Sequence, residues 1–63
     1  MSSKIDEQVK SIHQRALKCL ENGQPAKAVK LFRTAIKLSP HNASLMCNLG
    51  YALLKNEQYQ EAL

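Results

Sequence analysis

The residues that could coordinate a metal or attack a substrate are two histidines and two cysteines: His13, Cys19, His41 and Cys47. Zinc sites use closely spaced pairs such as C-x-x-C with H-x3-H, and a cysteine nucleophile needs an adjacent base and a group that orients it. This sequence has neither the paired spacing nor an acidic partner placed beside either histidine. We therefore expect no metal site, no cofactor and no catalytic residues, and predict that the chain is not an enzyme. Both histidines are expected to face solvent, and Cys19 to pack as a small core residue.

The acidic residues and glycines support the same conclusion. Asp6 and Glu7 stand where carboxylates stabilise the first turn of a helix, and Glu57 with Glu61 has the i, i+4 spacing of an exposed pair. The two glycines do not form a phosphate-binding loop. These patterns indicate helix ends and solvated surface rather than an acid–base site.

Basic residues are concentrated in the middle of the chain. Nine Lys and Arg against five Asp and Glu give a net charge of +4, and no acidic residue occurs between Asn22 and Asn56. Four basic residues would follow one side of a single helix, and we call them the basic stripe: Lys27, Lys30, Arg33 and Lys37. Such a stripe could neutralise phosphates, so a small basic helical nucleic-acid-binding protein is the alternative function. No aromatic residue or glycine lies within the stripe, so a solvated face is favoured and nucleic acid is not the expected partner.

The length and composition set limits on stability and location. A chain of 63 residues forms at most one small domain and buries only about 60% of the surface that its unfolded form exposes. The longest apolar run, residues 51–54, is far shorter than the roughly 18 residues of a membrane span, so no membrane interaction is expected. Two cysteines are too few for the disulfide framework of a small secreted domain. We expect a cytoplasmic protein, with the nucleus as the alternative.

Apolar residues recur with helical spacing from the start of the chain. The first set falls on one face of a helix: Ile5, Val9, Ile12, Ala16, Cys19 and Leu20. Ser3 is the predicted N-cap of this helix. The helix should stop near Glu21, because Asn22-Gly23 supplies residues that tolerate the left-handed conformation of a helix end.

Further helices follow after short connections. Pro25 suits the first turn of a second helix, which should end at Ser39-Pro40. Asn42 is the predicted N-cap of a third helix, and we expect a turn at Asn56-Glu57 before a fourth helix opens over residues 58–63. Connections of two to four residues require antiparallel neighbours, so the predicted fold class is all-α, built from antiparallel helical hairpins.

The sequence also repeats itself with a period of 34 residues. In this register four pairs of residues are identical: Leu20 and Leu54, Asn22 and Asn56, Gln24 and Gln58, and Ala28 and Ala62. A 34-residue period made of two helices and short turns is the signature of the tetratricopeptide repeat. The residues that match its pattern are Ala28, Phe32, Ala35 and Pro40 in the first unit, and Leu49, Gly50, Tyr59 and Ala62 in the second. The chain therefore resembles this family, as a single module over residues 1–63 with a complete repeat over 9–42 and an incomplete one over 43–63.

The resemblance implies how the module packs. Small residues let helices approach closely and large ones fill the gaps between hairpins. The small positions are Ala16, Ala28, Ala35, Gly50 and Ala62, and the large ones are Ile12, Phe32, Met46, Leu49, Leu53 and Tyr59. Because the second repeat is incomplete, Met46, Leu49 and Leu53 would lack a full partner. We expect a fragment of a longer repeat protein, with completion by another protein or self-association through the incomplete repeat as alternatives.

The resemblance also implies a function as a protein-interaction or scaffold module. In this family the first helix of each hairpin lines a concave groove that binds a peptide or a partner helix. By position, the groove residues are Lys10, His13, Leu17, Leu20, Asn48, Tyr51, Leu54 and Lys55, with Glu21, Ser44 and Cys47 beside them. Leu17, Tyr51 and Leu54 support this independently, because they lie off the packing stripes of their helices and yet are apolar or aromatic.

One subclass of the family grips acidic tails of heat-shock chaperones with a carboxylate clamp. Asn48 matches the asparagine that the clamp takes from its second repeat. However, His13 and Leu17 stand where the lysine and asparagine of the first repeat belong, and the third repeat of the clamp is absent. The sequence therefore does not support a carboxylate clamp.

Overall fold

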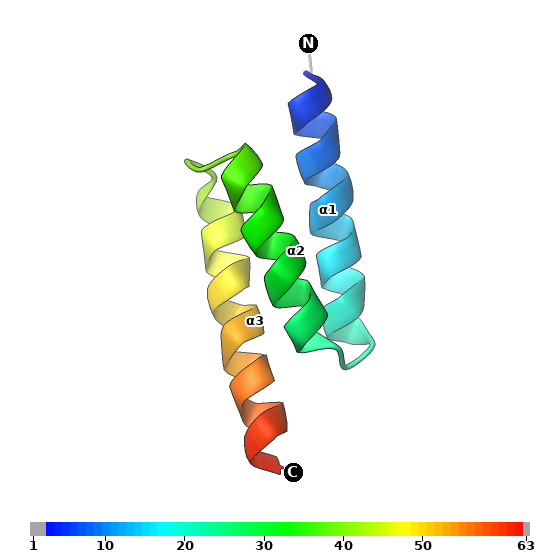
Figure 1. The fold of residues 1–63 in the computed structure, drawn as a ribbon, viewed down its shortest axis with the longest axis vertical. Helices are drawn as coiled ribbons and strands as arrows, with labels where there is room; N and C mark the ends of the chain where they lie inside the picture. The colour runs from blue at the N-terminus through cyan, green and yellow to red at the C-terminus, as the bar shows by residue number, and fades with distance from the viewer. Residues whose placement is uncertain (1–2, 63) are drawn as a thin grey trace.

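Three α-helices make up the described part of the chain, residues 3–62 of the computed structural model (Figure 1). They are α1 (Lys4–Glu21), α2 (Pro25–Leu38) and α3 (Ala43–Ala62). No strand occurs within these residues and the chain reverses direction at each connection, so the predicted all-α hairpin class is confirmed. The side chains of residues 60–62 are not described, so the predictions for Glu61, Ala62 and Leu63 lie outside the described residues.

The ends of α1 follow from its local sequence. Asp6 N–H donates to Ser3 Oγ (3.1 Å) and Ser3 N–H donates to Asp6 Oδ2 (3.3 Å), which forms a reciprocal capping box. At the other end Gly23 takes a φ of +73°, and Gln24 N–H donates to the carbonyl oxygen of Cys19 at 2.7 Å. The predicted cap and the predicted turn are both confirmed.

The starts of the next two helices also agree with the sequence. Pro25 occupies the first turn of α2, where a backbone N–H would have no intrahelical acceptor, so its missing N–H costs nothing. The helix ends before Ser39. Leu45 N–H donates to Asn42 Oδ1 (3.3 Å), so Asn42 caps α3 as predicted. Local hydrogen-bonding chemistry thus determines where both connections lie.

The predicted turn at Asn56-Glu57 is wrong, and so is the separate fourth helix, because α3 continues through this segment without interruption. The turn between α1 and α2 depends on Gly23 with its positive φ and on Pro25 at the start of α2. One repeat later these two positions hold Glu57 and Tyr59, neither of which favours a left-handed residue or a helix start. The local sequence therefore contains no signal strong enough to stop α3.

A single core forms where α2 packs against both α1 and α3 (Figure 1). Four predicted core residues have no exposed surface: Ala16, Ala28, Phe32 and Ala35. The alanines let the helices approach closely, and the Phe32 side chain fills the space between them. From α3 the core receives Leu45 and Ala52, which the sequence pattern does not single out, because α3 is apolar on several sides.

Another side of α3 is left open. Met46 and Leu53 are 51% and 41% exposed, in agreement with an incomplete second repeat, whereas Leu49 is half-buried against the core. Gly50 lies between them. Apart from the backbone of α3 and the adjacent residues, no atom of the described residues lies within 4 Å of the position that a Cβ would take there. The predicted close helix approach at Gly50 is therefore wrong for this chain.

Candidate functional site

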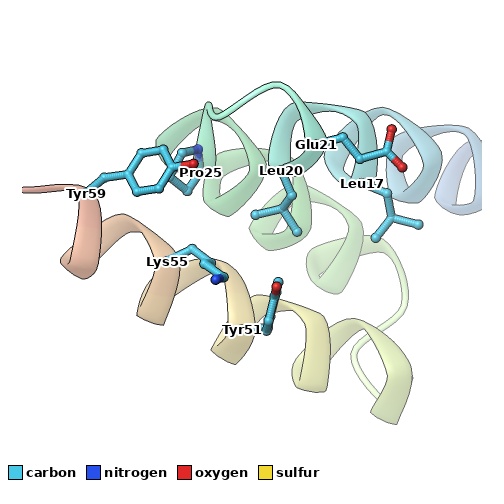
Figure 2. Close-up of a pocket in the computed structure, with 7 residues that line it drawn as sticks. All are labelled: Leu17, Leu20, Glu21, Pro25, Tyr51, Lys55 and Tyr59. Atoms are coloured by element: carbon cyan, nitrogen blue, oxygen red, sulfur yellow. The ribbon is translucent and has the colours of Figure 1, made fainter.

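A pocket lies between α1 and α3, at the start of α2 (Figure 2). Its volume is about 410 Å³, which is within the range of ligand-binding pockets in proteins. All three helices contribute to its lining, with apolar, aromatic and charged side chains: Leu17, Leu20, Glu21, Pro25, Tyr51, Lys55 and Tyr59. We call this feature the α1–α3 pocket.

The α3 wall of the pocket is a row of two tyrosines and a lysine. Tyr51, Lys55 and Tyr59 are spaced by four residues, so they follow one another along one side of the helix. Lys55 Nζ lies 5.5 Å from the centroid of the Tyr51 ring, a cation–π contact that places the ammonium group over the aromatic face. Both tyrosines are about half exposed, so the prediction that Tyr59 fills the core is wrong. The row presents aromatic surface and one positive charge to the pocket.

The α1 wall and the base are mainly apolar. Leu17 and Leu20 of α1 extend toward the α3 wall, and Glu21 follows them at the end of the helix (Figure 2). Pro25 adds apolar surface from the first turn of α2. Tyr59 reaches the turn between α1 and α2, since a Cβ at Gly23 would lie 3.5 Å from its ring. Because α3 is unbroken, the Tyr59 ring forms part of the pocket wall near this turn.

A side-chain hydrogen bond joins α1 to α3 outside the pocket lining. Asn48 Nδ2 lies 2.7 Å from His13 Nε2 and donates to it in the tautomer that carries the ring proton on Nδ1. The His13 ring also lies against Phe32, with 5.8 Å between the ring centroids. The prediction that His13 faces solvent is therefore wrong, because its half-buried side chain contacts Phe32 of α2 and Asn48 of α3. His41 is exposed, as predicted.

The structure brings together half of the predicted groove residues. Four of the eight line the α1–α3 pocket: Leu17, Leu20, Tyr51 and Lys55. Glu21, predicted to lie beside the groove, is also part of the lining. His13 and Asn48 bond to each other instead, and the exposed residues that do not line the pocket are Lys10, Ser44, Cys47 and Leu54. Their role in binding stays a prediction.

Two lining residues are absent from the predicted groove, Pro25 and Tyr59. The 34-residue register aligns them with each other and assigns Tyr59 to the start of a second hairpin helix. Only a continuous α3 carries Tyr59 back toward the turn that precedes Pro25. The available signal was the i, i+4, i+8 spacing of Tyr51, Lys55 and Tyr59, which places them along one side of a longer helix.

The remaining candidate residues lie elsewhere. Cys19 packs against the core as predicted, and Cys47 is an exposed free thiol. All four residues of the basic stripe are exposed on α2, and none of them lines the pocket. Within residues 3–59, no group of three or more His, Cys, Asp or Glu side chains is arranged to hold a metal ion. No described helix is both long and apolar enough to cross a membrane.

Comparison with known proteins identifies what the chain is similar to. A family model described as tetratricopeptide repeat matches residues 20–63. Tetratricopeptide repeat protein 21A of Homo sapiens is 40% identical over 40 residues, which cover 64% of this chain and 3% of that protein. The chain therefore spans only a small part of the length of this curated relative. No solved structure matches the chain significantly.

Proposed function

The chain belongs to the tetratricopeptide repeat family, and on this basis we propose that it binds a peptide or a partner helix in the α1–α3 pocket. Tetratricopeptide repeats generally mediate protein–protein interactions and are generally not enzymes. We further propose that the chain acts as part of a longer scaffold, since the relative that it matches is far longer than the chain.

The observation that supports this site is the gathering of exposed apolar and aromatic side chains around one hollow. Leu17, Tyr51 and Tyr59 are exposed large side chains, and they meet there although they come from different helices. A partner that buries these surfaces would gain hydrophobic free energy, and aromatic residues are enriched at the centres of such interfaces. The tyrosine hydroxyls and the charges of Glu21 and Lys55 would then orient the partner.

Peptide selection tests the proposal. Peptides would be selected from a random display library on the wild-type chain, and their affinities then measured for two variants. Tyr51→Ala removes an aromatic wall of the pocket and should weaken binding by about tenfold or more, as is typical of a central aromatic contact. The double variant Lys30→Glu, Arg33→Glu changes only the basic stripe and should alter affinity by no more than about twofold.

The same two variants examine the alternative of nucleic-acid binding. A labelled single-stranded oligonucleotide would be titrated at low and at moderate salt, because binding to phosphates weakens as salt rises. Tight, salt-dependent binding that Lys30→Glu, Arg33→Glu abolishes and Tyr51→Ala preserves would contradict the proposed function. Peptide binding with the opposite sensitivity would support it.

A further inference from the structure

The α1–α3 pocket carries one charge of each sign on opposite walls. Glu21 belongs to the α1 wall and Lys55 to the α3 wall (Figure 2). The Lys55 ammonium group lies over the face of the Tyr51 ring, 5.5 Å from its centroid. Leu17 and Leu20 add apolar surface to the same lining. The pocket lining therefore combines apolar surface with one negative and one positive side chain, which we call its charged edges.

This charge arrangement limits which partner fits. A ligand that covers the apolar surface of the pocket removes water from both charged edges, and Lys55 is already half-buried. An ionic group that loses water without gaining a partner costs free energy, so a ligand carboxylate beside Lys55 and a ligand cation beside Glu21 would compensate. A second acid beside Glu21, or a base beside Lys55, would add repulsion. A uniformly acidic or uniformly basic ligand would therefore satisfy one wall and oppose the other.

We propose that the pocket binds a peptide segment in which a large apolar residue is flanked by one acidic and one basic residue. The apolar side chain enters between Leu17, Leu20 and Tyr51, the acid pairs with Lys55, and the base pairs with Glu21. This inference rests on the proposed function, because it assigns the chemistry of the partner to the same pocket. The basic stripe on α2 takes no part in this recognition, because none of its residues lines the pocket.

Four synthetic peptides test the inference. Each has a central phenylalanine with a flanking residue two positions away on both sides, so the three side chains share one face of an extended chain. The flanking pairs are Glu and Arg, Glu and Glu, Arg and Arg, or Gln and Gln. Binding would be followed through the amide chemical shifts of Leu20 and Tyr51. The Glu and Arg peptide should bind about threefold tighter than the others, the scale of two partly exposed ion pairs.

Charge reversals make the test specific. Glu21→Lys leaves two positive edges and should shift the preference to the Glu and Glu peptide, whereas Lys55→Glu should shift it to the Arg and Arg peptide. The double reversal restores one charge of each sign and should restore the preference for the Glu and Arg peptide. Lys18→Glu is the matched control, because Lys18 is exposed on α1 outside the pocket lining, and it should keep the wild-type preference.

The outcomes separate this inference from the proposed function. If all four peptides shift the pocket amides equally in every variant, binding in the pocket stands and the charge inference is overturned. If none of them shifts these amides, the charge inference is overturned, and the library-selected peptides decide separately whether the pocket binds at all. Pocket shifts that grow with chain concentration without peptide would also overturn it, because a second copy would then be the occupant.

Discussion

Replacing either glycine with alanine should change stability, with opposite signs at the two positions. Gly23 has a φ of +73°, a conformation that costs an alanine about 1–2 kcal/mol. The new methyl group would meet the Tyr59 ring at 3.5 Å, an ordinary contact that adds no clash. The reduced freedom of the unfolded chain offsets part of the cost. Gly23→Ala should therefore destabilise the chain by about 1 kcal/mol.

Gly50 lies within α3 at a normal helical conformation, and beyond its own helix backbone and chain neighbours no described residue comes within 4 Å of the position of a Cβ. Alanine is a better helix former than glycine by about 0.5–1 kcal/mol. Because the site is open, no steric cost opposes this gain. Gly50→Ala should therefore stabilise the chain by about 0.5–1 kcal/mol.

Urea and thermal unfolding followed by circular dichroism would measure both effects. The two variants should differ in unfolding free energy by about 1.5–2 kcal/mol, which corresponds to roughly 10 °C in melting temperature for a domain of this size. A Gly50→Ala chain that is less stable than wild type would refute the reasoning, because a helix outside this chain would then be packed on Gly50. Sedimentation equilibrium across a concentration series would show whether that helix belongs to a second copy, as self-association through the incomplete repeat predicts.

Three further predictions concern the core, the first cap and the link between α1 and α3. Phe32→Ala removes a fully buried ring and should cost about 3–5 kcal/mol, so helicity measured by circular dichroism should collapse; a stable helical variant would contradict the assigned core. Ser3→Ala removes one side of the capping box and should cost about 1 kcal/mol in urea unfolding, whereas an unchanged midpoint would show that the cap does not form. Asn48→Ala removes the bond to His13 and should cost about 0.5–1.5 kcal/mol, measured in the same way; no loss would indicate that the bond is absent in solution.

The first two helices could be predicted from sequence because their ends are set by local chemistry. The capping box at Ser3 and the left-handed Gly23 each involve groups within a few residues of one another. The proline at the start of α2 acts through its own ring and missing N–H. Such signals operate in any tertiary context, so the structure agrees with them.

The features that sequence reasoning missed depend on competition between helices. α3 is apolar on several sides, so its periodicity did not distinguish the buried Leu45 and Ala52 from the exposed Met46 and Leu53. The choice among them is made by where α2 packs, which is a tertiary effect. His13 is half-buried for a related reason, since its ring contacts Phe32 of α2 and Asn48 of α3.

The pocket was predictable only in part for a related reason. Leu17 and Tyr51 stood out as apolar residues away from the packing stripes of their helices, and both line it. Tyr59 does not stand out in this way, because the repeat register places it after a turn, and the chain does not form that turn. The apolar residues away from the packing stripes therefore indicate where the pocket lies, whereas the continuity of α3 determines that Tyr59 also lines it.

The most direct test of the proposed binding site is to map a library-selected peptide onto the chain by amide chemical shifts. The account predicts that the largest changes fall on Leu17, Leu20 and Tyr51, the residues that α1 and α3 bring together. Changes centred on the basic stripe of α2, or on Met46 and Leu53 at the open side of α3, would contradict it.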